Sequence, residues 1–271
     1  MIGGVKMIII GEKINSKTVA IRDAIERKDT LFIQELAKRQ YEEGATYIDV
    51  NAEAFVNQSD TLEWLVSTIS DIIDAPFSID SQDASAIEKA LKINRNPKPI
   101  INSITGEKER LNSILPLVVN YATSVIALCR DDSGMPETIE ERLTITDNLI
   151  SRLTKEGVRF EDIYIDPFVR PVGAGTRNGS IALETFRKIR REFPDIHIAC
   201  GISNISYGIP ARKLMNQAFL VAAMVCGADT VILDPLDKKL MSLLYATETL
   251  TGNDEFCMNY QMKFREGMLD F

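Results

Sequence analysis

Short apolar runs recur along the whole chain, and longer stretches with the apolar spacing of helices separate them. Each run has four or five residues and most are rich in Ile and Val, which is typical of strands buried on both faces of a parallel sheet. The predicted strands are Met7–Ile10, Tyr47–Val50, Phe77–Asp80, Pro99–Asn102, Ser124–Leu128, Ile163–Asp166, Ile196–Ala199 and Thr230–Leu233.

The stretches between the runs predict helices. The clearest covers Ile139–Lys155, because Thr138 and Glu141 have the spacing of a capping box and Gly157 supplies a stop. Its apolar residues fall on one face of the helix. The other predicted helices are Leu31–Glu43, Leu62–Ile73, Ala84–Ile93, Ala182–Glu192, Ala211–Val225 and Lys238–Leu250.

Eight strands that alternate with helices predict an α/β protein built as a single (β/α)8 TIM barrel. An open doubly wound sheet is the alternative, which the lack of a GxGxxG motif after the first strand disfavours. No linker interrupts the pattern, so we expect one barrel domain over 1–252 and a C-terminal extension over 253–271. Phe256, Tyr260 and Phe264 are four residues apart in this extension. They predict either a terminal helix packed on the barrel or a contact to a partner protein.

Charge and composition exclude several classes of function. The net charge is −8 and no basic cluster is present, which argues against a nucleic-acid partner. The longest apolar run, Ala218–Cys226, is far below the ~20 residues of a membrane helix, and the N-terminal apolar run is too short for a signal peptide. The four cysteines are scattered, so we expect a cytoplasmic protein without a bound metal. The single histidine, His197, falls inside the seventh strand and is expected in the core or wall.

Polar side chains dominate the C-terminal ends of the predicted strands, where barrel enzymes hold their active sites. Single Asp and Asn residues at such places often cap the next helix, but so many together favour a ligand site. No basic cluster accompanies them to bind phosphate. Carboxylates that accept paired N–H groups, beside carboxamides, suit a neutral heterocycle such as a pterin or a guanine. The residues are Glu12, Asp49, Asn51, Asp80, Asn102, Asp166, Asn204 and Asp234.

The motifs around these positions resemble those of the pterin-binding methyltransferases. That family includes the methyltetrahydrofolate:corrinoid methyltransferases and the folate module of cobalamin-dependent methionine synthase. The resemblance spans nearly the whole chain, in order, with each motif at a strand end. Its motifs are Gly11-Glu12-Lys13-Ile14-Asn15, Asp49-Val50-Asn51, Ile79-Asp80-Ser81, Ile101-Asn102-Ser103, Ile165-Asp166-Pro167 and Gly201-Ile202-Ser203-Asn204-Ile205-Ser206.

The resemblance implies a barrel that binds tetrahydrofolate or methyltetrahydrofolate at its C-terminal mouth. It implies that Asp80, Asn102 and Asp166 hydrogen-bond the pterin ring, while Asn204 lies near N5, the atom that carries the methyl group, and acts in catalysis. Gly201 and Ser203 belong to the same binding loop. Supporting roles fall to Glu12, Asp49, Asn51 and Arg212, and further candidate cations at the rim are Arg130, Arg170 and Arg177.

The reaction implied is methyl transfer between N5 and the cobalt of a corrinoid. The short chain resembles components of anaerobic demethylation systems, so we favour transfer from a methylcorrinoid to tetrahydrofolate, with the reverse direction as the first alternative. A dihydropteroate synthase-like enzyme is the next, although Ile232–Asp237 lacks the basic motif of those enzymes, and a non-catalytic folate-binding scaffold is the last. Because no Asp-x-His-x-x-Gly run is present, the corrinoid is expected on a separate partner protein. The resemblance also implies a homodimer.

Overall fold

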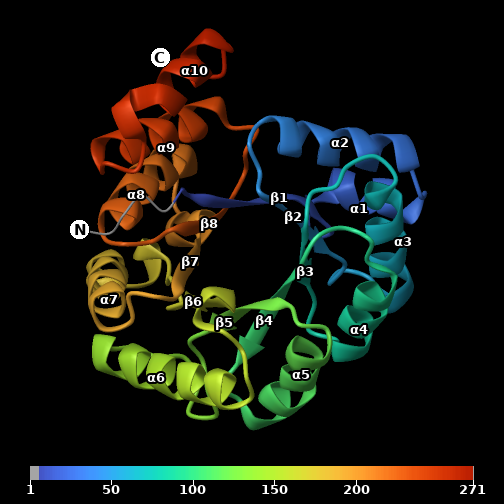
Figure 1. Cartoon of the computed structure of the whole chain (residues 1–271), viewed down its shortest axis with the longest axis horizontal. Coiled ribbons are helices and arrows are strands. Elements are labelled where there is room, and N and C mark those ends of the chain that lie inside the picture. The colour runs from blue at the N-terminus through green and yellow to red at the C-terminus, as the bar shows by residue number, and fades with distance from the viewer. Residues whose placement is uncertain (1–5, 271) are drawn as a thin grey trace.

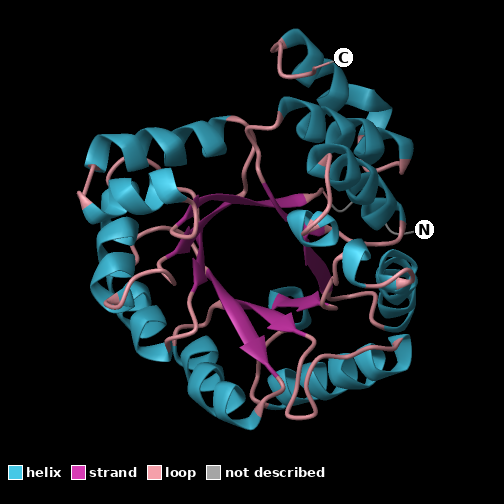
Figure 2. Ribbon diagram, turned by 180° about the vertical axis from the view of Figure 1, so that it is seen from behind, coloured by secondary structure: helices cyan, strands magenta, loops and turns pink. Residues whose placement is uncertain are grey.

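Eight parallel strands form a closed barrel in which each strand pairs with its neighbours in sequence and β8 pairs with β1. The structure is a computed structural model and describes residues 6–270. Figures 1 and 2 show the ring of strands from its two ends, with helices around it. The TIM barrel prediction is therefore confirmed. The strands are β1 (Ile8–Asn15), β2 (Tyr47–Asn51), β3 (Phe77–Asp80), β4 (Ile100–Thr105), β5 (Ser124–Leu128), β6 (Ile163–Asp166), β7 (His197–Gly201) and β8 (Thr230–Leu233).

Four strands, β3, β5, β6 and β8, have the predicted bounds. The others extend further toward the mouth than predicted, most of all β1, which continues through its polar end to Asn15. Polar residues there do not end a strand, because parallel pairing with β2 continues through Ile14 and Asn15 after a bulge. The strand ends are thus longer and more polar than the apolar pattern indicates.

Helices surround the barrel, and within residues 6–270 none combines the length and apolar character needed to cross a bilayer. The predicted helices are present. Those over Ala84–Ile93, Ile139–Lys155 and Lys238–Leu250 have the predicted bounds, and the other four differ from prediction by a few residues. Two were not predicted, the short α1 and α5. Pro116 conceals α5 in the sequence, but it lies on the exposed side, where water can solvate the carbonyl group left without a partner. The helices are α1 (Val19–Glu26), α2 (Thr30–Glu42), α3 (Gln58–Ser70), α4 (Ala84–Ile93), α5 (Lys108–Asn120), α6 (Ile139–Lys155), α7 (Asn178–Glu192), α8 (Arg212–Val225), α9 (Lys238–Leu250) and α10 (Met258–Arg265).

The capping box of α6 forms as predicted. The Thr138 hydroxyl accepts a hydrogen bond from the Glu141 N–H (3.1 Å), and the Glu141 carboxylate accepts one from the Thr138 N–H (3.1 Å). Thr138→Ala should lower the free energy of unfolding by about 1 kcal/mol, measured by urea denaturation. Thr144→Ala, on the exposed face of the same helix, is the control and should change stability by less than about 0.5 kcal/mol. An equal loss in both variants would contradict a specific role of the cap.

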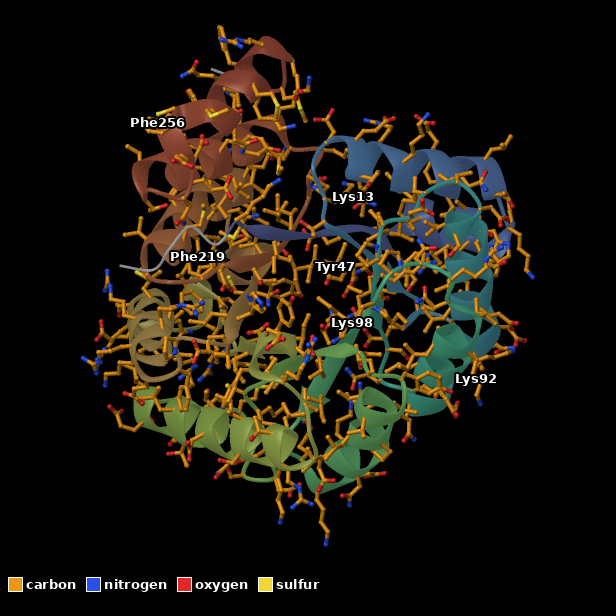
Figure 3. All side chains as sticks on the ribbon, in the orientation of Figure 1. Lys13, Tyr47, Lys92, Lys98, Phe219 and Phe256 are labelled. Atoms are coloured by element: carbon orange, nitrogen blue, oxygen red, sulfur yellow. The ribbon has the colours of Figure 1, made fainter. Side chains whose placement is uncertain are left out.

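Apolar side chains fill the barrel separately from the larger core between strands and helices. Ile10, Ile126 and Tyr164 are buried there, and Figure 3 shows Tyr47 within the ring. His197 begins β7 at the end opposite the mouth, where its ring stacks on Tyr164 with centroids 4.4 Å apart. This placement confirms it as a wall residue and leaves the C-terminal end of the barrel for the polar groups.

The C-terminal extension lies beyond α9, outside the ring of helices (Figure 1). It contacts α9 through the N–H of Asp270, which donates to the Ser242 hydroxyl (2.8 Å), and through Lys263, whose ammonium lies 5.8 Å from the centre of the Tyr245 ring. Phe256 precedes α10 with a φ of 52°, so it does not share a helical face with Tyr260, contrary to the four-residue spacing. Phe256 is exposed, and whether a partner protein contacts this extension stays a prediction.

Candidate functional site

Three of the predicted pterin-binding residues lie on β3, β4 and β6 at the barrel mouth. Asp80 is the last residue of β3 and is the register partner of Asn102 in β4. Asp166 ends β6. The fold brings them to one rim because all the strands run in the same direction around a closed ring.

A hydrogen-bond network joins the polar side chains of β2, β3 and β4. Asn51 donates through Nδ2 to Oδ2 of Asp80 (2.7 Å). One layer below, Oδ1 of Asp49 accepts from the Ser78 hydroxyl (2.6 Å) and from Nδ2 of Asn102 (3.3 Å). The amide nitrogens of Asn51 and Asn102 therefore both point at carboxylates. Among the described residues this arrangement leaves an oxygen of Asp80 and the carbonyl oxygen of Asn102 for a ligand.

The loop after β7 carries the predicted catalytic residue. Gly201 ends β7, and Ser203 and Asn204 lie in the 3-10 turn Ile202–Ser206. Asn204 is exposed at the mouth, and its side chain folds back over Gly201, where a Cβ atom would lie only 3.1 Å from Nδ2 of Asn204. A side chain at position 201 would therefore have to displace the Asn204 carboxamide by a few tenths of an ångström. The Asn204 carboxamide presents one donor and one acceptor beside the strand ends.

Burial raises the pKa of the carboxyl groups at this mouth. Desolvation raises the pKa of Asp80 to about 6, against the hydrogen bond from Asn51. Burial likewise raises the pKa of Asp166 to about 6, opposed by the Phe168 N–H that donates to it (2.9 Å). For Asp49, burial and then the nearby Asp80 carboxyl raise the pKa well above its usual value. Perturbed carboxyls that gather at one rim indicate a functional site.

Glu12 and Arg212 line a cavity of about 300 Å³ at the rim, together with Ser203 and Asp234. Burial, and next the Asp234 carboxyl, raise the pKa of Glu12 to about 7. Lys13 donates to Asp234 (2.8 Å) and ties the end of β1 to the chain after β8. Glu12 thus faces the open part of the mouth beside the loop that carries Asn204.

Three of the four candidate rim cations already have protein partners. Arg212 donates to the Ser203 carbonyl oxygen (2.9 Å), so it holds the loop that carries Asn204. Arg130 pairs with Glu107 (3.0 Å), and Arg170 pairs with Glu137 (3.5 Å). Arg177 lies exposed at the start of α7. Arg212 therefore supports the site through the backbone.

Sequence reasoning missed Ser16, Ser78 and Arg110. The Ser16 hydroxyl donates to Oδ1 of Asn51 (2.9 Å), which orients the amide that contacts Asp80. Ser78 lies inside the barrel below Asp80, and Arg110 contacts the backbone beside the β3 and β4 ends. Serines carry no distinctive spacing, and Arg110 belongs to the unpredicted α5.

Thiols and metal-ligating side chains could also carry chemistry, and the groups concerned are Cys129, Cys200 and the His, Cys, Asp and Glu side chains of the described residues. Cys129 and Cys200 are buried, and burial raises the pKa of both thiols, that of Cys129 to about 12, so they stay protonated. Across residues 6–270 no group of three or more His, Cys, Asp or Glu side chains is arranged to hold a metal ion.

Comparison with known sequences identifies a matching family and relatives that align with most of the chain. Residues 19–234 match the pterin-binding enzyme family. The chain is 35% identical to a methylcorrinoid:tetrahydrofolate methyltransferase of Eubacterium limosum, over 97% of this chain and 98% of that protein. It is also 26% identical to methionine synthase of Mycobacterium tuberculosis, over 83% of this chain and 20% of that longer protein.

Solved structures show the same fold. A dihydropteroate synthetase superposes with a TM-score of 0.69 at 16% identity, covering 91% of this chain and 95% of that one. A dihydropteroate synthase of Coxiella burnetii, solved with pteroic acid, gives a TM-score of 0.69 at 16% identity over 90% of this chain and 94% of that one. The family match and the near full-length relative together confirm the resemblance inferred from the motifs. The chain belongs to the pterin-binding enzyme family and is a homologue of a methylcorrinoid:tetrahydrofolate methyltransferase.

Proposed function

We propose that this protein transfers a methyl group from a methylated corrinoid, carried by a separate protein, to N5 of tetrahydrofolate. The observation that carries the proposal is the joint set of Asp80, Asn102, Asp166 and Asn204 at one barrel mouth in a chain that aligns end to end with a methylcorrinoid:tetrahydrofolate methyltransferase. The relative's name supports this direction. The reverse transfer would use the same side chains.

The mouth suits the edge of a pterin. Asp80 and Asp166 can accept from its amino group and ring N–H groups, and the free carbonyl oxygen of Asn102 can accept a further hydrogen bond. Each carboxyl already receives a hydrogen bond from the protein, from Asn51 and from the Phe168 N–H, so the acceptors are held in position before a ligand arrives. Such preorganisation lowers the entropy lost on binding.

Asn204 is proposed to act on the reacting atom. The methylated corrinoid supplies a methyl group that is open to nucleophilic attack. As the lone pair of N5 forms the new bond to carbon, the cobalt–carbon bond breaks and its electron pair stays on the cobalt. Positive charge then develops on N5 and its hydrogen becomes acidic. The Asn204 carbonyl oxygen can accept a hydrogen bond from N5–H that strengthens as this charge develops, and this stabilises the transition state. In the reverse direction the same carboxamide donates to N5 as the methyl group departs.

The N5 proton must then leave the site. A carboxamide does not take up a proton, so we propose a relay through water to a mouth carboxyl such as Asp49. Asp49 is buried, contacts Asn102, and has a pKa well above its usual value because of burial and the nearby Asp80. A raised pKa makes the ionised carboxylate a stronger base, which suits it to accept a proton.

The corrinoid is proposed to arrive on a partner. The chain has one histidine, His197, and it lies at the opposite end of the barrel, so this chain offers no imidazole to cobalt at the mouth. The open rim beside Glu12 and Arg212 leaves access to N5 from outside the barrel. The proposal includes a cytoplasmic location, which the cysteine pattern favours, and a homodimer, which the family resemblance favours.

The test is a direct assay of methyl transfer. Methylcobalamin and tetrahydrofolate are mixed with the protein, and the cobalt absorbance and methyltetrahydrofolate are followed together; methyltetrahydrofolate with cob(I)alamin tests the reverse. Turnover in either mixture supports methyl transfer, and the ratio of the two rates tests the direction. Folate binding without turnover would favour the scaffold alternative. Release of pyrophosphate from a pterin pyrophosphate with p-aminobenzoate would instead favour a dihydropteroate synthase.

The affinity for tetrahydrofolate should fall below about pH 6 and level off above pH 7. Asp80 and Asp166 both have pKa values of about 6, and only their ionised forms accept two N–H groups, so protonation weakens binding. For each carboxyl that must lose its proton before the ligand binds, the affinity falls by up to about tenfold per pH unit below the pKa. Calorimetric titration with tetrahydrofolate from pH 5 to 8 measures this dependence. Asp166→Asn should show a shallower slope, and an identical slope would contradict the assignment.

A further inference from the structure

Arg110, on the first turn of α5, bonds only to backbone at the barrel mouth. Its Nε and Nη2 both donate to the Ser103 carbonyl oxygen, at 2.9 and 2.6 Å. Nη2 also donates to the Ser81 carbonyl oxygen (2.8 Å), and Nη1 donates to that of Gln82 (2.7 Å). One guanidinium therefore joins the chain after β3 to the end of β4.

The contacted carbonyl groups directly follow the two proposed pterin-binding residues of these strands. Ser81 follows Asp80, and Ser103 follows Asn102. The strands are already linked there by the Ser81 N–H, which donates to the Asn102 carbonyl oxygen (3.2 Å). Arg110 adds its four hydrogen bonds at the point where regular pairing between β3 and β4 ends.

We infer that Arg110 is a positioning residue, which fixes the distance and orientation between Asp80 and Asn102 and thereby sets the affinity for the pterin. This inference rests on the proposed function. The guanidinium is planar and has five N–H donors in a fixed geometry, so it can hold two strands at once. A lysine in its place has one ammonium group and cannot reproduce this bridge.

The same device occurs at the other two ligand-bearing loops. Arg142, on α6, donates to the Pro167 carbonyl oxygen (2.9 Å), next to Asp166. Arg212, on α8, donates to the Ser203 carbonyl oxygen, next to Asn204. Arg110 differs because it connects two strands that both carry proposed ligands. We therefore expect its loss to change the shape of the site, since a displacement of about 1 Å at such groups is enough to weaken binding.

Arg190 provides a matched control at the opposite end of the barrel. It donates to the carbonyl oxygens of Ile196 (2.7 Å) and Gly227 (3.2 Å) and pairs with Asp229 (2.8 Å). Its side chain is about 12% exposed, so removing it leaves Asp229 without its guanidinium partner and should destabilise the fold at least as much as removal of Arg110. It does not touch the proposed pterin-binding strand ends.

The experiment compares tetrahydrofolate affinity with thermal stability in Arg110→Ala, Arg110→Lys and Arg190→Ala. We expect the dissociation constant to rise about tenfold to a hundredfold in Arg110→Ala, by analogy with groups that orient the ligands of metal ions. Arg110→Lys should recover only part of the affinity. Arg190→Ala should keep the wild-type dissociation constant despite a lower melting temperature. If Arg190→Ala does not fold, Arg190→Lys serves as the control in its place.

Wild-type affinity in Arg110→Ala, or affinity losses in both arginine variants that simply follow their melting temperatures, would overturn the inference. If Arg110→Ala does not fold, wild-type affinity in Arg110→Lys would overturn the inference instead. Asp80→Asn is measured in parallel to separate this inference from the proposed function. If Asp80→Asn loses affinity and Arg110→Ala does not, only the positioning role fails. If Asp80→Asn also binds normally, the proposed pterin site itself is wrong.

Discussion

Asn204→Ala should slow methyl transfer about a hundredfold to a thousandfold while the affinity for tetrahydrofolate changes by less than about threefold. The side chain is exposed at the mouth beside Gly201 and contributes little to the folded core. Its proposed hydrogen bond to N5 gains strength mainly as charge develops on that atom. The loss should therefore fall on the rate of the chemical step and leave the stability of the bound state nearly unchanged.

Single-turnover kinetics with saturating tetrahydrofolate and methylcobalamin measures this loss, and calorimetry measures the affinity. Asn148→Ala, an exposed change on α6, is the matched control and should keep both values. Asn204→Gln tests the geometry, because it keeps the carboxamide but displaces it by one methylene group. A rate in Asn204→Ala close to wild type would remove this residue from the mechanism. A loss of affinity with an unchanged rate at saturation would mean that Asn204 binds folate equally in the ground and transition states.

Asp80→Asn is expected to lower pterin affinity about a hundredfold and to stabilise the protein at pH 8. The change replaces a charged acceptor by a neutral carboxamide, whose N–H₂ group then faces the N–H groups of the pterin. Hydrogen bonds to charged groups contribute about 1.5–3 kcal/mol, and this contribution is lost. The Asn51 amide can still donate to the new carbonyl oxygen, so the network in the protein remains possible. Calorimetric titration with tetrahydrofolate measures the loss of affinity.

The gain in stability follows from the raised pKa of Asp80, about 6 instead of 3.8. A carboxyl whose pKa is higher in the folded state favours folding fully below its unfolded pKa, and this contribution is lost as the pH rises through the folded pKa. Asn cannot ionise, so Asp80→Asn should gain on the order of 2 kcal/mol at pH 8 and nothing near pH 4. Asp71→Asn, at an exposed surface ion pair, should show less than about 1 kcal/mol at either pH. A stability difference that is independent of pH would contradict ionisation as its cause.

The sequence determined the architecture because the signals of this fold are local. Apolar runs of strand length mark β3, β5, β6 and β8 residue for residue, and the capping box marks the start of α6. Pro116 in α5 is a misleading local signal. The helix forms there because its buried apolar face packs against the barrel, and the local sequence does not show this packing.

The sequence also predicted which end of the barrel holds the polar residues, because parallel strands all end at the same rim. Asp80, Asn102 and Asp166 could be named from their places at strand ends. Their contacts could not, since Asn51 meets Asp80 and Asp49 meets Asn102 across separations of 29 and 53 residues.

Only the tertiary structure decided the state of these groups. Closing the sheet into a ring removes the carboxyls from water, and this burial is what raises the pKa values of Asp80 and Asp166. The role of Arg110 was hidden for the same reason, because its partners are backbone carbonyl groups on two strands that meet only in the closed barrel. Residue types and their order follow from the chain alone, whereas burial and side-by-side contact follow from the stagger of strands that are distant in sequence.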